Sequence, residues 1–320
     1  MMDDKILNIF RSTNGEFISG EEVSEKLGIS RAAVWKHIEQ LRKDGYEITG
    51  EPHVGYRLVG TPDKLIPEEV SHKLGTKVIG RKIYSYESTD STNDVAHRLA
   101  QSGSPEGTVV FSEGQSKGRG RMGRHWVSPK GKGIYFSFIL RPDVSPAEAP
   151  KITLTSAVAV ALAIRKATHL GALIKWPNDI LINNHKAVGI LTEMSAEVNT
   201  VRYIVLGIGI NVNTSKSELP KEATSLRAEA GEEISRVELA QEVLRELDRQ
   251  YRVFNDKGFK KIIDEWKGLS HTLGSEVKIA CQHRKIEGTA VDLDPSGALV
   301  VRLDNGFTEH VTAGDVLMVR

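Results

Sequence analysis

The chain has 320 residues, enough for two domains of ~100–200 residues and a third small one. Its 43 basic and 42 acidic residues leave a formal net charge of +1, which excludes a global field that would draw the whole chain to nucleic acid or an anionic membrane. A single cysteine, Cys281, excludes intramolecular disulfide bonds and cysteine-based zinc sites, and we expect a cytoplasmic protein. The longest apolar run, residues 152–164, is too short for a membrane span, and the acidic N-terminus is unlike a signal peptide, so we expect no membrane association.

Two helix-start signals follow each other in the first 62 residues. Ser19 stands three residues before Glu22, the spacing of a capping box, and Gly28 is placed to end the helix that begins there. Ser30 repeats the signal for a second helix, which we expect to run to Lys43. Two helices joined by a short turn are typical of a helix-turn-helix, and two short β runs behind them occupy the position of a wing. We predict a winged helix-turn-helix in residues 1–62.

The second of these helices combines an apolar face with a basic one. Val34, Ile38 and Leu41 share one face and should be buried. Residues 1–60 carry eight basic and ten acidic side chains, but residues 31–43 carry four basic and one acidic, a patch that can neutralise phosphates. The alternative is a small helical domain with no DNA-binding role. The residues that we expect to contact DNA are Ser30, Arg31, Ala32, Lys36, Arg42, Lys43 and, in the wing, Arg57.

Two prolines within residues 61–67 predict a boundary, and a second domain should cover residues 67–270. Strand-like and helix-like runs mix there, and Asn183 and Asn184 have the sequence of a two-residue hairpin turn. We expect strands at 109–111, 134–140, 174–175, 180–182, 187–191 and 203–210, and helices at 90–102, 147–169 and 236–253. These elements predict an α+β domain with a mixed, largely antiparallel sheet.

Residues 115–133 contain six basic residues, five glycines and no acidic residue. Glycine is costly to order and like charges repel, so we expect a loop that wraps an anion with backbone N–H groups and guanidinium donors and becomes ordered on binding it. The alternative is a solvated basic loop. Gly118, Gly120 and Gly123 match the spacing of a dinucleotide-binding fingerprint, but Pro129 and two later glycines forbid the helix that must follow, so we reject a Rossmann site.

Three further clusters could carry chemistry. Lys175, Asn178 and Asp179, with Lys186 beyond the hairpin, suit an anionic ligand and its metal ion, although a solvated surface turn has the same composition. Residues 88–93 offer hydroxyl and amide groups for a neutral polar head group, or simply an N-cap. Residues 207–213 place glycines within a strand, which admits close approach of a planar group.

The last part of the chain, residues 271–320, is predicted to be a separate small domain. It contains five short β runs, at 276–280, 286–291, 298–303, 308–311 and 316–319. Five short strands in about fifty residues predict a small SH3-like barrel. Cys281 follows the first strand, and we expect it to be a half-buried apolar residue.

In chain order these motifs resemble those of the biotin–protein ligases, and with the helix-turn-helix in front the chain is similar to the bacterial bifunctional biotin ligases that also repress biotin genes. The motifs are residues 87–93, 118–126, 175–179, 186–191 and 207–211. The resemblance implies biotin contacts from Ser91, Thr92, Asn93, Gln115, Arg119, Gly120, Arg121, Trp126 and Lys186. It implies nucleotide contacts from Arg121, Lys175, Asn178, Asp179 and Asn211, catalytic roles for Lys186, Arg121 and Asp179, and a magnesium ion with ATP at Asp179. One departure is Ala223, which stands where some members place a tryptophan over the adenine.

The implied chemistry fits these residue types. A carboxylate is a poor acyl donor, so biotin must first be activated by ATP to biotinyl-5′-AMP, with Lys186 and Arg121 stabilising charge on the phosphoryl oxygens. An ordered loop would exclude water from this mixed anhydride until a lysine of a biotin carboxyl carrier domain attacks it. The same adenylate would act as corepressor by favouring a homodimer on operator DNA. Two alternatives stay open: a ligand-sensing transcription factor without catalysis, and a lipoate ligase of the same fold.

Overall fold

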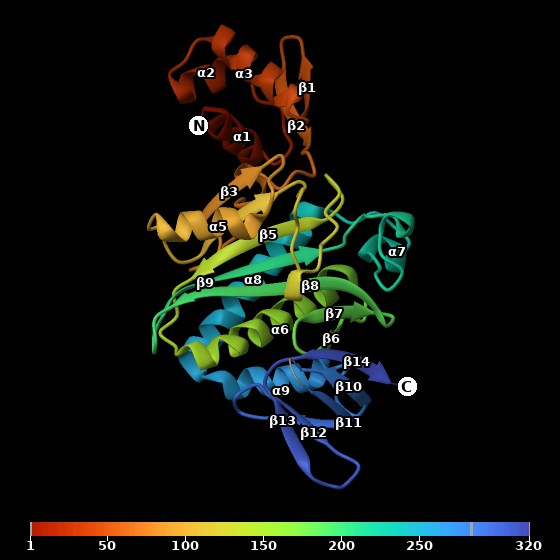
Figure 1. Cartoon of the computed structure of the whole chain (residues 1–320). Coiled ribbons are helices and arrows are strands. Elements are labelled where there is room, and N and C mark those ends of the chain that lie inside the picture. Colours follow the sequence, from red (N-terminus) through yellow and green to blue (C-terminus); the bar gives the residue numbers. More distant parts are fainter. Residues whose placement is uncertain (1, 282–283, 320) are drawn as a thin grey trace. The chain divides into compact units, whose positions relative to one another are not determined.

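The computed structural model describes residues 2–281 and 284–319. The chain forms two compact units, Met1–Lys64 and Leu65–Arg320. Figure 1 labels the elements of both units, each of which is described by itself below. The structure is α+β, with an N-terminal helix-turn-helix unit, a central mixed sheet and a C-terminal antiparallel sheet, as the sequence predicted. The finer division at residues 270 and 271 stays a prediction.

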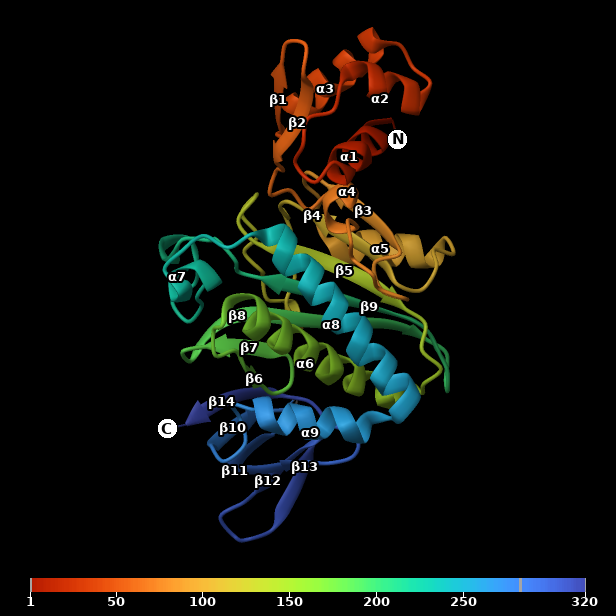
Figure 2. The same ribbon diagram turned by 180° about the vertical axis from the view of Figure 1, so that it is seen from behind.

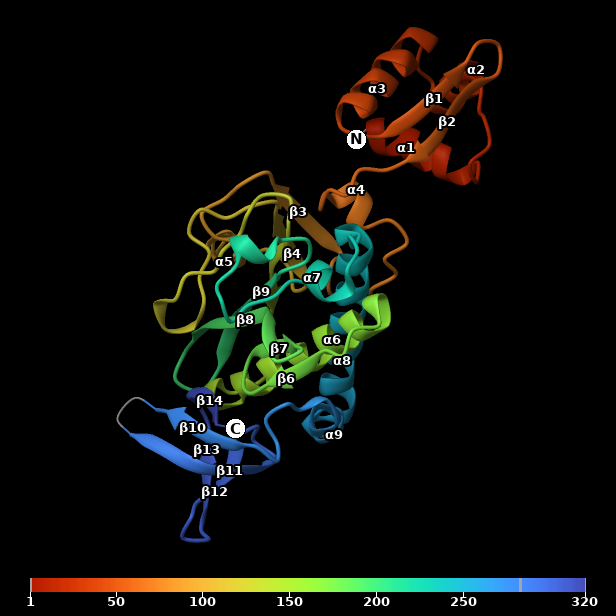
Figure 3. The ribbon, with the colours of Figure 1, turned by 90° about the vertical axis from the view of Figure 1, so that its right-hand side faces the viewer.

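The N-terminal unit is a winged helix-turn-helix. Its elements are α1 (Met2–Ser12), α2 (Gly20–Leu27), α3 (Arg31–Lys43), β1 (Glu47–Glu51) and β2 (Gly55–Gly60), with β1 and β2 paired antiparallel (Figure 3). Both predicted caps are present, because Ser19 accepts a hydrogen bond from the backbone N–H of Glu22 and Ser30 accepts one from Ala33. Gly28 ends α2 in the left-handed conformation. Val34, Ile38 and Leu41 are buried as predicted, in a core with residues of α1 and β1.

The second unit is built on a seven-stranded sheet in the order β3-β4-β5-β9-β8-β7-β6. Its strands are β3 (Lys82–Tyr86), β4 (Thr108–Ser112), β5 (Ile134–Leu140), β6 (Leu173–Lys175), β7 (Asp179–Ile182), β8 (His185–Ala196) and β9 (Val201–Ile210). All neighbours are antiparallel except β3 and β4. Asn183 and Asn184 both have positive φ in the hairpin between β7 and β8, so the predicted two-residue turn is confirmed.

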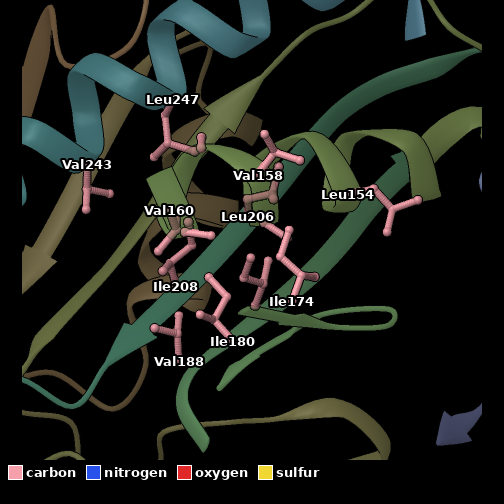
Figure 4. Packing of buried hydrophobic residues seen from close by; sticks show 14 of the residues in the cluster. Leu154, Val158, Val160, Ile174, Ile180, Val188, Leu206, Ile208, Val243 and Leu247 are labelled. Atoms are coloured by element: carbon pink, nitrogen blue, oxygen red, sulfur yellow. The ribbon is translucent and has the colours of Figure 1, made fainter. Parts of the chain in front are cut away.

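Helices cover the two faces of this sheet unequally. The helices are α4 (Pro67–Val70), α5 (Thr92–Gln101), α6 (Ala149–Thr168), α7 (Leu226–Ala230), α8 (Arg236–Lys257) and α9 (Phe259–Leu269). Helices α6 and α8 pack on one face, where Leu206 and Ile208 of β9 meet Val158 and Leu247 in the main core (Figures 2 and 4). On the opposite face α5 covers only the part around Val205, and the remainder of that face holds the site described below.

Helix α6 is longer than the apolar run of residues 152–164 seen in the sequence. With the turn before it, Pro146–Thr168 is a 23-residue helix long and apolar enough to cross a bilayer by length and composition. Two thirds of its apolar window (67%) is buried inside the unit, where it packs on the sheet and on α8. Its apolar character is therefore explained by its place at the centre of the core.

The C-terminal sheet contains the five predicted strands. They are β10 (Glu276–Ala280), β11 (Lys285–Leu293), β12 (Leu299–Arg302), β13 (Thr308–Val311) and β14 (Asp315–Val319), in the order β13-β12-β11-β10-β14, and every pair is antiparallel. Cys281 is half-buried, as expected. The first residue of β14 is Asp315.

Candidate active site

The site begins with a row of residues that the register places across one face of the sheet. Lys175 pairs with Asp179, Asp179 with Gly189, and Gly189 with Gly209. Because side chains alternate between the two faces of a sheet, the glycines leave a bare strip on the face opposite α6 and α8. Gly207 continues this strip along β9. A floor without side chains of its own lets other groups pack directly against the backbone, and at Gly207 that group is the amide of Asn93.

The indole of Trp126 rests on this glycine floor. A Cβ atom at Gly209 would overlap the indole nitrogen, and one at Gly189 would lie 2.9 Å from its Cζ3. The ammonium of Lys186 stands 5.5 Å from the centre of the ring, within the range of a cation–π contact. Trp126 and Lys186, which are far apart in the sequence, thus form adjoining walls of one cavity.

Charge at the centre of the cavity is concentrated in three groups. The ammonium nitrogen of Lys186 lies 2.7 Å from an oxygen of Asp179. Burial lowers the pKa of Lys175. The negative charge of Asp179 opposes this lowering of the pKa, and the positive charge of Lys186 adds to it. An incoming anion would relieve the repulsion between the two lysines, so these residues favour a phosphate-bearing ligand.

The amide of Asn178 connects this centre to the glycine-rich loop. Asn178 donates to the carbonyl of Ile190 over 2.8 Å and accepts a hydrogen bond from Arg121 over 2.9 Å. Arg121 also donates to the carbonyl of Gly314 over 3.3 Å. The guanidinium of Arg121 is therefore held between the central sheet and the C-terminal sheet.

The opposite end of the cavity is a closed network of neutral polar groups. Ser91, Thr92 and Asn93 are buried at the start of α5. The side-chain oxygen of Gln115 accepts from the backbone N–H and the hydroxyl of Thr92 over 2.9 and 3.2 Å. Ser137 of β5, which the sequence analysis missed, is completely buried and lies within hydrogen-bond distance of both Thr92 and Asn93. Such an arrangement suits a neutral head group with several polar atoms.

Glu193 is a second residue that the sequence analysis missed. Its carboxylate accepts from the amide of Asn93 over 2.6 Å and from the guanidinium of Arg119 over 3.0 Å. Hydrogen bonds from His97 and Asn93 and the charge of Arg119 lower the pKa of Glu193 to about 2, against the opposing effect of burial. Glu193 therefore joins the head-group network to the first arginine of the glycine-rich loop.

The glycine-rich loop is held by acidic side chains. Arg119 pairs with Asp94 at 2.6 Å as well as with Glu193, and Arg124 pairs with Asp315 at 2.6 Å. Between the two arginines the chain turns back on itself, with a bridge from Arg119 to His125 and a single 3-10 turn at Arg121–Gly123. Because this turn opens no α-helix, the rejection of a Rossmann site is confirmed.

A single cavity of about 970 Å³ collects every residue predicted to bind biotin or nucleotide. Those residues are Ser91, Thr92, Asn93, Gln115, Arg119, Gly120, Arg121, Trp126, Lys175, Asn178, Asp179, Lys186 and Asn211. The amide of Asn211 donates to the carbonyl of Thr224, and the backbone of Ala223 runs beside that of Lys186, so Ala223 also lines the cavity.

A magnesium ion that travels with ATP fits this donor set. In residues 2–281 and 284–319 there is no group of three or more His, Cys, Asp or Glu side chains suited to hold a metal on their own. Mg²⁺ in phosphate-transfer sites needs only one or two carboxylates when substrate phosphates supply the other oxygens, and Asp179 offers one inside the cavity.

The residues predicted to contact DNA fall into two groups. Ser30 caps α3, Arg42 donates to the carbonyl of Ile48 and pairs with Glu39, and the guanidinium of Arg57 lies 4.6 Å from the ring centre of Phe17. The others point outward on α3. They are Ala32 and the three cations Arg31, Lys36 and Lys43, and no ion pair of these cations occurs in the described part of the chain.

Comparisons with known proteins agree with this architecture. Residues 85–211 match the biotin/lipoate A/B protein ligase family, residues 4–57 match an HTH domain, and residues 272–319 match the biotin protein ligase C-terminal domain. The fold and the cavity therefore define a ligase of the biotin/lipoate class preceded by a helix-turn-helix.

Relatives that match nearly the whole chain identify the family more narrowly. A Bacillus subtilis protein named bifunctional ligase/repressor BirA is 41% identical over 312 residues, covering 96% of each chain. The Escherichia coli protein of the same name is 32% identical, covering 95% of this chain and 93% of that one. A biotin protein ligase from Aquifex aeolicus, solved with biotin and ATP, is 30% identical with a TM-score of 0.65 and covers 75% of this chain and 99% of its own. The chain belongs to the family of bifunctional biotin ligases and repressors.

Proposed function

We propose that this chain joins biotin to ATP to form biotinyl-5′-AMP and then transfers biotin to a lysine of a biotin carboxyl carrier domain. One observation carries the proposal: a single cavity places a neutral hydrogen-bonding network at one end and Lys186, Asp179 and Arg121 at the other. The first end suits the ureido ring of biotin, and the second suits the α-phosphate of ATP. Family membership supports the same assignment.

In the first step an oxygen of the biotin carboxylate bonds to the α-phosphorus of ATP and the bond to pyrophosphate breaks. Negative charge grows on the phosphoryl oxygens, and the ammonium of Lys186 and the guanidinium of Arg121 are placed to stabilise it. Asp179 would hold the Mg²⁺ that accompanies ATP, and this ion would neutralise phosphate charge. Trp126, which lies on the glycine floor, would help to wall the cavity around biotin.

In the second step the amine of the acceptor lysine attacks the carbonyl carbon of the mixed anhydride and AMP leaves. Water competes for the same carbon, so the adenylate must be covered until the acceptor arrives. Residues 119–121 and 124–126 line the cavity, and Arg121 contacts both the central and the C-terminal part of the unit, which suits this loop to the covering role. The three arginines of the loop would exchange their carboxylate partners for the ligand.

The adenylate would also act as corepressor by favouring a homodimer that binds operator DNA. Strand β7 pairs with β8 only as far as Gly189, so within the described residues the stretch from Leu191 to Ala196 has no strand partner on that side. An open edge of this kind can pair with the same edge of a second copy. Two helix-turn-helix units on one operator would then add their affinities. We further propose that this takes place in the cytoplasm.

A half-reaction assay tests the enzymatic proposal. Pyrophosphate should be released when biotin and ATP are both present, and Lys186→Gln should abolish the release while biotin still binds, although more weakly, in calorimetry. Arg121→Gly should form the adenylate more slowly and lose it to solvent, with indiscriminate labelling of lysines. Biotin binding without pyrophosphate release by the native chain would show a sensor without catalysis, and preference for lipoate in competition would overturn the substrate.

A further inference from the structure

Helix α3 exposes a tryptophan on the face that carries the unpaired cations. The side chain of Trp35 is 53% exposed, in contrast to Val34 and Ile38 on either side of it, which are completely buried. One turn before it the same face carries Arg31 and Ala32. An indole in contact with water does not gain the free energy of apolar burial. An exposed tryptophan therefore indicates that a binding partner covers this side chain.

The surroundings of Trp35 indicate which surface that is. Lys36 follows it directly, Lys43 lies two turns further on, and Arg31 lies one turn before it. These three cations are exposed and make no ion pair among residues that the structure describes. Ala32 adds a small side chain, which permits close approach of the helix to its partner. Uncompensated positive charge around an apolar centre is complementary to a groove with phosphates at its edges and apolar groups on its floor.

We propose that Trp35 reads thymine in the operator by packing its indole against the 5-methyl group in the major groove. The inference rests on the proposed repressor role and names one residue that would give the repressor its preference for a DNA sequence. The methyl group of thymine is the apolar feature that distinguishes an A·T pair from the other pairs in the major groove. Arg31, Lys36 and Lys43 would hold α3 on the phosphates without reading sequence.

The test uses the full chain with biotin and ATP, and a duplex enriched by it from a random pool. Each thymidine of that duplex is replaced in turn by deoxyuridine, which pairs identically but lacks the methyl group. We expect roughly fourfold weaker binding at each contacted position, from the ~0.8 kcal/mol of one buried methyl group. The effect should disappear in Trp35→Ala and persist in part in Trp35→Phe.

Two controls distinguish recognition of thymine by Trp35 from non-specific electrostatic binding to DNA. Phe307→Ala removes another exposed aromatic side chain, in the C-terminal sheet (73% exposed), and should leave the deoxyuridine effect unchanged. Trp35→Ala should keep its salt dependence, whereas Lys43→Ala should lower the slope by ~0.9 for each subunit, or ~1.8 for the dimer, because it removes one phosphate contact per subunit.

The outcomes distinguish this inference from the repressor role. Equal binding of every deoxyuridine duplex, or the same discrimination by Trp35→Ala, would overturn the reading role and leave the repressor role standing. A change in self-association of Trp35→Ala without DNA, seen in sedimentation, would show that the indole contacts protein and would also overturn it. Failure to enrich any duplex would overturn the repressor role and this inference together.

Discussion

At Gly189 and Gly209 the two central strands carry no side chain on the cavity face, and the indole of Trp126 fills the space. Glycines in a strand indicated close approach of a planar group, but the sequence did not show that the group is a tryptophan from the loop. Only the register, which sets Gly189 opposite Gly209, reveals a continuous floor.

Gly209→Ala should therefore move Trp126. The added Cβ would overlap the indole, and overpacking of this kind costs about 1–3 kcal/mol. We expect pyrophosphate release to slow by roughly tenfold or more, measured under saturating biotin and ATP. Gly268→Ala is the matched control, because nothing lies within 4 Å of that Cβ in α9 and alanine favours a helix. An unchanged rate in Gly209→Ala would show that Trp126 plays no part in adenylate formation.

The residues that the sequence analysis missed share a physical reason. Ser137 and Glu193 are single polar residues in otherwise apolar or mixed strands, and nothing local marks them. They become part of the site only because the sheet brings Asn93 and Arg119 to them. Runs of polar residues, such as residues 88–93, can be found from sequence, whereas isolated partners require the tertiary structure.

Glu193→Gln should lower the stability of the folded chain, and the size of the loss should depend on pH. The pKa of Glu193 is lowered in the folded chain, so its ionised form stabilises the fold above its ordinary pKa and this contribution is lost as the pH falls toward 2. The difference in melting temperature between the native chain and Glu193→Gln should be constant from about pH 8 to about pH 5 and shrink below about pH 4.5. The biotin KM should rise as well, because Asn93 and Arg119 lose their shared anchor.

Glu197→Gln supplies the control for this experiment. Its partner Arg202 and its own side chain are both mostly exposed, at 64% and 63%, so the pair should contribute little. A stability difference for Glu193→Gln that does not diminish on acidification would refute an ionised Glu193 in the folded chain.

At the scale of elements, the sequence predicted the long apolar strands and the three largest helices, because each has a clear period or an uninterrupted apolar run. It missed β3, α9 and the two short helices α4 and α7. In α9 the buried residues Phe259, Ile262, Ile263 and Trp266 have helical spacing, so the signal was present and was overlooked. β3 was missed because it is short and only partly buried.

The glycine-rich loop depends on a residue from a distant element. Asp315 pairs with Arg124 and stands 3.9 Å from Arg121. Asp315→Asn should free the loop in the ligand-free chain, since each exposed pair is worth ~0.2–1 kcal/mol. Cleavage by trypsin within residues 119–124 should become several-fold faster, and a stable adenylate mimic should restore protection.

Asp304→Asn, an exposed aspartate of the same C-terminal sheet region, is the control and should leave cleavage unchanged. Equal cleavage of Asp315→Asn and the native chain would mean that Asp315 does not hold the loop. Cleavage that a bound mimic fails to slow would refute the covering role of the loop itself.

At the scale of the whole molecule, two functions are assigned to two units. The second unit begins with a buried anchor, the hydrogen bond from the backbone N–H of Leu65 to Glu113, which also pairs with the buried Arg236. We expect a fragment of residues 65–320 to fold and to transfer biotin at the native rate.

That fragment should show no binding to a duplex enriched by the full chain, measured by fluorescence anisotropy with biotin and ATP present. Loss of ligation on removing residues 1–64 would instead show that the first unit supports the enzyme, and the separation of functions would be wrong.

The proposed coupling between these functions depends on the proposed dimer, and this dependence can be tested quantitatively. If the adenylate favours pairing of two β8 edges, duplex binding by the full chain should rise with the square of protein concentration only when biotin and ATP are both present. Met194 lies on the open edge and is 44% exposed, so Met194→Lys places like charges against each other across the proposed pairing. Sedimentation should show a monomer with ligand, and duplex binding should weaken.

Met194→Lys should nevertheless keep its pyrophosphate release, since no atom of Met194 lines the ligand cavity. Val291→Lys, an exposed position on β11, provides a charge-matched control that should leave dimerisation unchanged. A ligand-bound Met194→Lys chain that dimerises as the native chain does would place the interface elsewhere. First-order duplex binding by the native chain would contradict the dimer itself, because one helix-turn-helix would then suffice for the operator.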